Sequence, residues 1–474
     1  MNAFPVTAAL LLTLFTGAVQ AAPVPSLDND PVGYLRYVQT SPDAAAVAAR
    51  REIAGGPVAL ARERAGAQKE GLAVFPAQLN RPLPPPDQNA APLYVKVAAL
   101  RRGRVRLPNY AETLSARYAY TAAQLERVQK IYDDNPDVFA LLRQATEKPV
   151  CVFVRDWTKD AMNPPFTEFA GLRESAREIK TESVLLAEEG RYAEAVTTQA
   201  RGYRLAEHAA SDGTLISYLV AQAMDAIATS GMGDILTLAG PNADVAALVT
   251  QAITERGAHL SLRRGLSGEI ALQDAEFALL RHGDALDFKT LFDNSVPISS
   301  LPRARFTPGE RQAYLNLLDA AEADAISRML RVLAAADTPA QAAVFAQATQ
   351  DATAQTSDPV RMVSDKLSPL QFGTLNVLPA RGAASRAVVQ AAAAVLAARA
   401  KTGTYPDALP QPSPDPFTGK PLGYRREGAG GFVVYSAGPD GTFGGGKPGD
   451  KTPPGAVLFR YPAPAAPVPQ DVLK

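Results

Sequence analysis

Glu189-Gly190-Arg191-Tyr192-Ala193-Glu194-Ala195 lies between two segments in which apolar residues recur three and four positions apart. This spacing predicts an amphipathic helix on each side of the stretch. Gly190 suits the end of the first helix, because glycine adopts a left-handed backbone conformation without steric cost. The small Ala195 allows the two helices to approach closely. The stretch therefore predicts a helical hairpin whose second helix runs to about residue 210.

Comparable segments recur from about residue 121 to 357. Ser211-Asp212-Gly213 ends the second helix of the hairpin, Asn242 is placed to cap a further helix, and Thr307-Pro308 starts a segment that extends to Ala336. Helices of roughly 15–25 residues with short connections predict antiparallel hairpins stacked on one another. We therefore expect a mainly α fold with a helical domain at residues 94–375.

The stretch around Gly190 resembles part of a tetratricopeptide repeat through Gly190, Tyr192 and Ala195. The resemblance implies one helical hairpin of this style. The full repeat of about 34 residues does not recur along the chain, so a regular repeat array is not expected.

Residues 22–93 are predicted to be an N-terminal segment with a proline-rich linker, Arg81-Pro82-Leu83-Pro84-Pro85-Pro86-Asp87. Such a composition favours an extended, semi-rigid backbone. Two short apolar stretches follow at 94–97 and 104–107. They fit two strands around Gly103, or one helix, because Ala98-Ala99-Leu100 lies between them. The sequence is compatible with both alternatives.

The first 21 residues have the features of a signal peptide. An apolar run of about 12 residues ends near Val19, and cleavage after Ala21 is predicted. The run is shorter than the roughly 20 residues that span a bilayer, and an uncleaved anchor is the alternative. No later stretch of 18 apolar residues lacks charge. We expect an exported chain without a stable transmembrane anchor, in the periplasm, the cell envelope or the extracellular space.

The composition is that of a globular protein, because 47% of the 474 residues are hydrophobic and 20% are charged. The 48 Lys and Arg residues balance the 48 Asp and Glu residues, so the net charge is +0 at pH 7. General polyanion binders carry a basic excess, and no nucleic-acid partner is therefore expected. Cys151 is the single cysteine and lies in an apolar run, which predicts a buried thiol rather than a disulfide.

Towards the C-terminus a small α+β module is predicted at residues 381–461. An alanine- and valine-rich helix at 383–401 precedes glycine- and proline-rich turns and two short strands at 422–424 and 432–435. Residues 462–474 are rich in proline and alanine and are predicted to be a disordered tail.

This module resembles the soluble domain of the major pseudopilin of type II secretion systems. The resemblance rests on an ordered set of motifs: a helix, Gly403-Thr404-Tyr405-Pro406, Asp415-Pro416-Phe417-Thr418-Gly419-Lys420-Pro421-Leu422-Gly423-Tyr424, and Tyr435-Ser436-Ala437-Gly438-Pro439-Asp440-Gly441. It implies a helix packed on a small sheet and a calcium-binding loop after the last motif. Residue by residue, Asp440 and Asp450 match the acids of that loop, and Ala437 is placed to offer a carbonyl oxygen to calcium. A glycine-rich structural loop without metal is the alternative.

Residues 89–235 resemble an uncharacterised group of large exported bacterial proteins, many of which end in the same module. The resemblance implies no activity. It rests on Asn89-Ala90-Ala91-Pro92-Leu93-Tyr94, Cys151 with Asp156, Leu172-Arg173, Gly190-Arg191-Tyr192 with Ala195, and Thr214-Leu215-Ile216-Ser217 with Leu219-Val220.

Familiar catalytic motifs are incomplete in this sequence. The glycine-rich run before Lys447 nearly matches a phosphate-binding loop, but Pro448 stands where Ser or Thr is needed. Ser267-Gly268 lacks the flanking residues of a nucleophile elbow. Glu255 and His259 are four residues apart and could share a helix face and a metal, although a surface contact is the plainer interpretation.

Several charged residues are expected to be exposed. Acidic pairs such as Glu322 with Asp324 are expected on solvated helix faces, and Arg101-Arg102-Gly103-Arg104 is expected at a solvated strand or turn edge. His208 is expected near the C-terminal end of a helix, where a cation is favoured.

Three functional hypotheses follow. The first is a non-catalytic, exported interaction or scaffold protein of the cell envelope, because stacked hairpins offer extended contact surfaces to a protein partner. The second is an envelope hydrolase whose carboxylates come from distant helices. The third is an accessory component of a type II secretion or pilus apparatus. A filament subunit is not expected, because its membrane helix would begin the mature chain and continue directly into the module.

Overall fold

The computed structural model describes residues 25, 27, 30–107, 114–161, 164–257, 259–282, 306–336, 358–367, 377–447, 456–463 and 466–467. The predicted signal peptide lies outside these residues. Contacts divide the chain into two compact units. Met1–Arg51 and Gly283–Tyr314 make up the smaller unit, and Glu52–His282 and Leu315–Lys474 make up the larger one. The domain boundaries expected from composition stay predictions.

The smaller unit contains α1 (Pro31–Thr40) and the first part of α2 (Ala44–Ala54). It also contains the first turns of α15 (Pro308–Ala336). The Arg36 guanidinium forms an ion pair with Glu310 at 2.7 Å, so α1 and the start of α15 are held together by charge.

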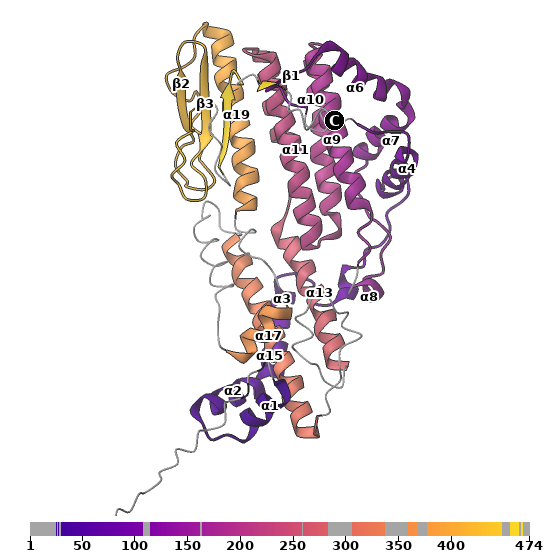
Figure 1. Ribbon diagram of the computed structural model, residues 1–474, viewed down its shortest axis with the longest axis vertical. Helices are drawn as coiled ribbons and strands as arrows, with labels where there is room; N and C mark the ends of the chain where they lie inside the picture. Colours follow the sequence, from indigo (N-terminus) through magenta and orange to yellow (C-terminus); the bar gives the residue numbers. More distant parts are fainter. Residues whose placement is uncertain are drawn as a thin grey trace, which may run out of the picture. The chain divides into compact units, whose positions relative to one another are not determined.

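The larger unit is mainly helical, as the sequence predicts (Figure 1). Its further helices are α3 (Gly56–Lys69), α4 (Ala91–Arg101), α6 (Ala122–Asp134), α7 (Pro136–Glu147), α8 (Trp157–Asp160), α9 (Glu168–Glu188), α10 (Tyr192–Ala209), α11 (Leu215–Ala239), α12 (Ala243–Arg256), α13 (Leu262–His282), α17 (Pro359–Leu367) and α19 (Leu378–Thr402), with short 3₁₀ turns η1 (Pro76–Leu79) and η2 (Ala210–Asp212). Residues 94–97, for which strand and helix were both compatible with the sequence, belong to α4.

The helices α9, α10 and α11 lie side by side and form the centre of this unit (Figure 1). Gly190 connects α9 and α10 with a φ of 77°, which confirms the predicted turn. Gln199 of α10 is fully buried and ties the three helices together, because it accepts a hydrogen bond from Ser183 of α9 and donates one to the Ala228 carbonyl of α11. A β-carbon at Gly231 would overlap the Gln199 amide, so this glycine permits the close approach of α11.

The predicted C-terminal sheet has three antiparallel strands in the order β2-β3-β4, with bounds β2 (Gly423–Glu427), β3 (Gly431–Ser436) and β4 (Val457–Tyr461). α19 packs against β3 and β4. The buried rings of Phe432 and Phe459 belong to the same apolar cluster as residues of α9, α10, α11 and α12. The C-terminal residues thus share one core with the helices.

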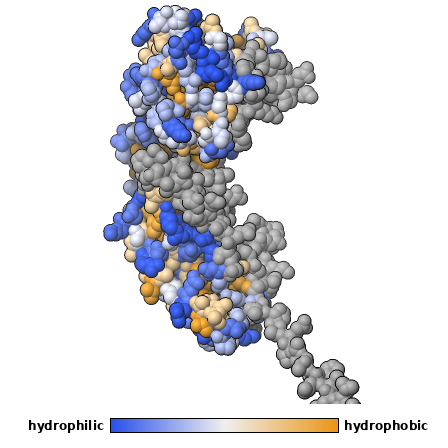
Figure 2. Space-filling model, turned by 90° about the vertical axis from the view of Figure 1, so that its left-hand side faces the viewer, coloured by the Kyte–Doolittle hydropathy of each residue, from blue (hydrophilic) through white to orange (hydrophobic). Residues whose placement is uncertain are grey.

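Within the predicted disordered tail, β5 (Ala466–Pro467) pairs in parallel with β1 (Tyr118–Ala119), so these two tail residues are paired. The surface that includes β2 is largely hydrophilic, with scattered apolar residues (Figure 2). Arg425 and Arg426 contribute exposed guanidinium groups there. Within the described part of the chain, no helix combines the length and apolar character needed to cross a membrane.

Candidate functional site

The predicted calcium loop is a tight, glycine-rich turn in which Asp440 is exposed. The Thr442 backbone N–H donates to Asp440 Oδ1 at 3.1 Å, and this hydrogen bond holds the pKa of Asp440 below its usual value. The Ala437 carbonyl, expected to face calcium, accepts the Phe443 N–H at 3.0 Å. Asp450 lies outside the described residues, and within those residues no three His, Cys, Asp or Glu side chains cluster as metal ligands would.

A different acid organises this loop. Asp415 is 1% exposed, and its carboxylate accepts hydrogen bonds from Phe417 N, Ser436 Oγ and Ala437 N at 2.7–3.0 Å. It therefore links the turn before β2 to the end of β3. Sequence analysis quoted Asp415 within a motif but gave it no role; an Asp two residues before a potential backbone donor was the available signal.

The structure describes the side chains of two of the histidines, His208 and His259. His208 was expected to be a favoured cation near a helix end, but it is 3% exposed. Its burial, together with the charge of Arg204, lowers its pKa to about 4, so the ring is neutral. The Tyr94 hydroxyl and the Lys148 carbonyl oxygen contact its two ring nitrogens at 2.8 and 3.1 Å. His259 lies beyond the end of α12, so it does not share a helix face with Glu255.

Burial decides one further expectation about charge and one about cysteine. Arg101 was expected at a solvated edge, but it is 7% exposed and pairs with the buried Glu178 at 2.7 Å. That pairing is favoured because each charge would otherwise be unpaired in the core. Cys151 is buried as predicted, and burial raises the pKa of its thiol.

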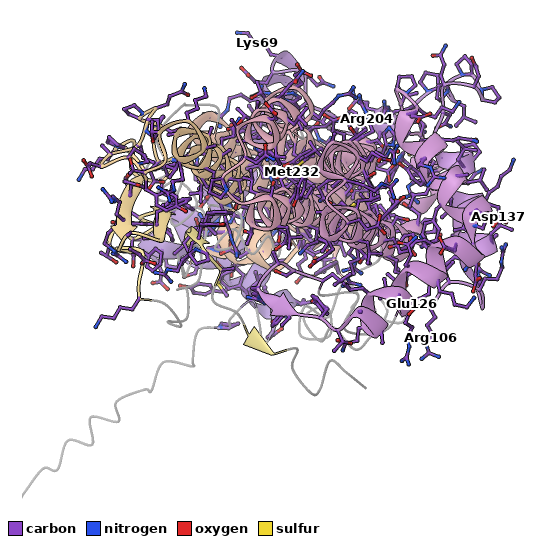
Figure 3. All side chains as sticks on the ribbon, turned by 90° about the horizontal axis from the view of Figure 1, so that it is seen from above. Lys69, Arg106, Glu126, Asp137, Arg204 and Met232 are labelled. Atoms are coloured by element: carbon purple, nitrogen blue, oxygen red, sulfur yellow. The ribbon has the colours of Figure 1, made fainter. Side chains whose placement is uncertain are left out.

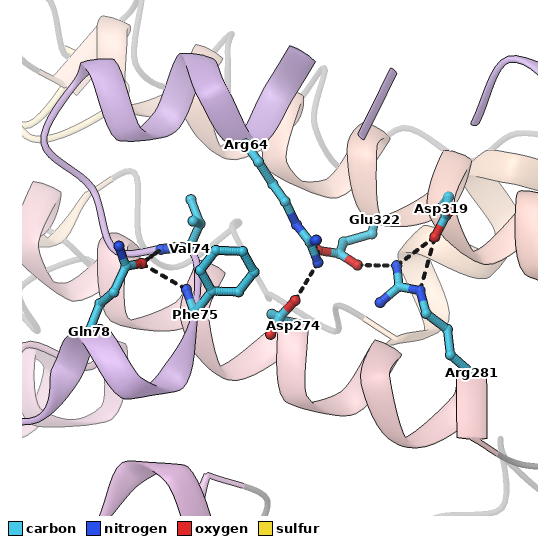
Figure 4. A network of polar contacts seen from close by, with 8 residues as sticks. All are labelled: Arg64, Val74, Phe75, Gln78, Asp274, Arg281, Asp319 and Glu322. Atoms are coloured by element: carbon cyan, nitrogen blue, oxygen red, sulfur yellow. Dashed lines mark hydrogen bonds and ion pairs between the residues drawn. The ribbon is translucent and has the colours of Figure 1, made fainter. Parts of the chain in front are cut away.

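Glu322 was also expected on a solvated face, and this was wrong. Its side chain is 1% exposed and lies between Arg64 of α3 and Arg281 of α13, both of which form ion pairs with it (Figure 4). Arg64 also pairs with Asp274, and Arg281 pairs with Asp319 at 2.9 Å. We call these five residues the α3–α13–α15 charge network.

The charge network brings together three carboxylates, Asp274 of α13 and Asp319 and Glu322 of α15, so acids from separate helices meet as the hydrolase hypothesis requires. Burial and the neighbouring charge of Glu322 raise the pKa of Asp274 to about 6. All three carboxylates are, however, paired with either Arg64 of α3 or Arg281 of α13. A general acid or base must reach its substrate, so this geometry fits a structural role better than a catalytic one.

A groove of about 410 Å³ lies where α7, α10 and α12 meet. Its floor is formed by apolar side chains, and its sides carry polar and charged ones. The floor residues are Val196, Ala200, Leu248 and Ala252, and the sides include Thr146, Glu147, Thr197, Arg201, Arg204, Glu207, Gln251, Glu255 and Arg256. The groove thus offers an incoming group both a small apolar surface and many polar and charged side chains.

The charges of this groove are not all neutralised within the chain. Arg204 pairs with Glu207 at 2.8 Å. The half-buried Arg201 has neither an ion pair nor a hydrogen bond among the described residues. Burial lowers the pKa of Arg201, and the charges of Glu182 and Glu147 act against this effect. Glu182 is paired with Arg143 at 3.5 Å. The guanidinium of Arg201 is therefore available to an incoming anionic group.

Sequence analysis did not single out this groove. Its residues lie on three helices that are separated in the sequence, and the spacing of Arg201 and Arg204 is ordinary for an exposed helix face. Comparison of the chain with protein-family models, curated proteins and solved structures gives no match.

Proposed function

We propose that the chain is an exported, non-catalytic interaction protein of the cell envelope that binds a segment of a partner protein in the groove between α7, α10 and α12. The observation that carries this proposal is the half-buried Arg201, which lies beside an apolar floor and forms no ion pair among the described residues. An arginine fork binds a carboxylate with two parallel hydrogen bonds. The partner segment therefore presents a carboxylate to Arg201 and apolar side chains to the floor.

The other charges of the groove support a peptide over a simple anion. Glu147 and Glu255 lie on the groove sides together with Arg204 and Arg256, so both signs of charge are offered along its length. A free anion would be repelled by the acids, whereas a peptide carries backbone donors and side chains of either sign. Complementary charge then selects the partner and its direction.

The resemblances add to this proposal. We infer a pseudopilin-like module at residues 381–461, because α19 is followed by the antiparallel strands β2, β3 and β4 and packs against two of them. We also retain the tetratricopeptide-like character of the α9–α10 hairpin. Both features are compatible with a partner that belongs to a secretion or pilus apparatus. Identification of the crosslinked partner would show whether it does.

The proposal is tested by photo-crosslinking in producing cells. A photoreactive amino acid replaces Gln251, which is exposed in the groove, or Glu126 of α6 as the control. In Figure 3 Arg204 and Glu126 lie on opposite sides of the helices. We expect a discrete crosslinked protein in the envelope fraction from position 251 only.

The same crosslink should be lost in Arg201→Gln and partly kept in Arg201→Lys, since lysine keeps the charge without the fork. A crosslink that is unaffected by Arg201→Gln, or that forms equally at position 126, would contradict the proposal. Fractionation of the same cells tests export: a chain that stays in the cytoplasm would contradict that part.

A further inference from the structure

Two arginines converge on one carbonyl oxygen at the turn between α10 and α11. Arg81 Nη1, just after η1, donates to the Ser211 carbonyl at 2.6 Å. Arg264 Nη2, in the first turn of α13, donates to the same oxygen at 2.6 Å. A neutral carbonyl thus brings two like charges together, which costs free energy unless a negative charge offsets them.

No carboxylate pairs with either of these arginines among the described residues. Asp212, which lines the same pocket as the two arginines, accepts two hydrogen bonds from Arg155 at 2.9 and 3.0 Å. Arg155 also forms an ion pair with Glu168. Three arginines therefore face two acids, and one positive charge is in excess. Burial and the charge of Arg81 lower the pKa of Arg264, as expected for two cations held close together.

These two arginines line a pocket of about 280 Å³, which we call the α10–α11 turn pocket. Ser267, Gln78 and Asp212, whose carboxylate is paired with Arg155, also line it. Ser267 Oγ accepts the Ala73 N–H at 2.7 Å, so its own hydroxyl proton is available. The oxygen of Gln78 is used by two backbone N–H groups, which leaves its amide nitrogen as a donor.

The backbone adds to the positive potential of the pocket. Gly213, which lines it, lies two residues before the first residue of α11, a helix of 25 residues. The N-terminal end of a helix carries a partial positive charge. The pocket thus combines two arginine forks, two neutral donors and a helix start, a set of groups that suits an anion with several oxygens.

We propose that the α10–α11 turn pocket binds a small tetrahedral oxyanion, the phosphoryl group of free phosphate or of a phosphate ester. The oxyanion lies between the Arg81 and Arg264 guanidinium groups and accepts hydrogen bonds from them and from Ser267 and Gln78. This proposal does not depend on the groove at Arg201, which lies on other helices.

Isothermal titration of the full chain with inorganic phosphate at low ionic strength tests the proposal. Sodium chloride at matched ionic strength controls for screening. We expect saturable binding of one phosphate, weakened about tenfold or more in Arg81→Gln and in Arg264→Gln, because each removes charge-assisted hydrogen bonds. Arg263→Gln is the matched control, because this neighbouring arginine pairs with Glu70.

Thermal melts keep the result interpretable if a variant is less stable. Phosphate should raise the melting temperature of the original chain and of Arg263→Gln, but not that of the Arg81→Gln/Arg264→Gln double variant. Absence of saturable binding, or equal stabilisation of the double variant, would overturn the proposal. Titration with glycerol 3-phosphate distinguishes a phosphate ester from free phosphate as the ligand. Tighter binding than that of inorganic phosphate would assign the pocket to a phosphate ester, and weaker binding would assign it to the free ion.

Discussion

Asp415 accepts its three hydrogen bonds while it is almost fully withdrawn from water. Replacing it with alanine leaves the Phe417 and Ala437 N–H groups and the Ser436 hydroxyl without their acceptor. Each buried group that loses its partner costs about 1–3 kcal/mol. We expect Asp415→Ala to lower the free energy of unfolding by at least about 2 kcal/mol, measured by calorimetry or urea denaturation.

Asp440→Ala is the control from the same loop, because this aspartate is exposed and bonds only within its own turn. We expect a change within about 1 kcal/mol. Equal losses in the two variants would show that Asp415 does not organise the loop.

The environments of single charged residues could not be predicted from the sequence, because their partners are remote. Arg101 is buried by its pairing with Glu178, which is 77 residues away along the chain. Glu322 is buried by contact with Arg64, 258 residues away. Nothing local distinguishes these residues from solvated charges. The groove at Arg201 could not be predicted for the same reason. It depends on how α7 and α12 pack against α10 and on the absence of an ion-pair partner for Arg201 among the described residues.

Among the elements, α13 packs against the start of α11 through Gly268. A β-carbon there would overlap the Gly213 carbonyl and lie 2.8 Å from Thr214 Cα. Backbone atoms cannot move aside as a flexible side chain can. We therefore expect Gly268→Ala to destabilise the protein by about 1–3 kcal/mol, measured by urea denaturation.

Gly66 of α3 provides the matched control, because its nearest neighbour to a new β-carbon would be Leu330 Cδ1 at 4.0 Å. Alanine restricts the unfolded chain and favours helix, so Gly66→Ala should stabilise the protein by about 0.5–1 kcal/mol. A destabilisation of similar size in both variants would contradict the close approach at Gly268.

Elements with strong local signals were predictable. The ends of α9 and α10 follow from Gly190 and the break at Ser211-Asp212-Gly213, and Asn242 caps α12 as expected, accepting hydrogen bonds from Asp244 and Val245. The strand β4 was missed, because its pairing with β3 is not local and its five residues include Arg460. The stretch at 94–97 was ambiguous because four residues cannot separate the helical period from the strand period.

In the molecule as a whole, several half-buried carboxyl groups hold protons more tightly than the unfolded chain does. Burial raises the pKa of Glu269 to about 7. Burial and the charge of Glu269 raise the pKa of Glu276 to about 7, and that of Asp274 is about 6. From about pH 4.5 to 7 the folded chain keeps protons that the unfolded chain has released, so stability falls as the pH rises through this window.

His208 makes stability rise with pH instead of fall, but it does so at lower pH. Its lowered pKa means that the unfolded chain binds a proton below about pH 6.5 while the folded chain does not. Above that pH the histidine term vanishes and the carboxyl groups act alone. We therefore expect a higher melting temperature at about pH 6.5 than at about pH 8, measured by calorimetry at constant ionic strength.

The double variant Glu269→Gln/Glu276→Gln tests whether these two residues cause the fall in melting temperature between the two pH values. Glutamine has nearly the same shape but does not titrate, so the variant should lose part of the difference between the two pH values. It should also be more stable than the original chain at about pH 8, where both half-buried glutamates are otherwise ionised in a partly desolvated environment. If the melting temperature rises with pH, or if the variant keeps the full slope, these two glutamates are ionised in the folded chain at neutral pH and must have cationic partners.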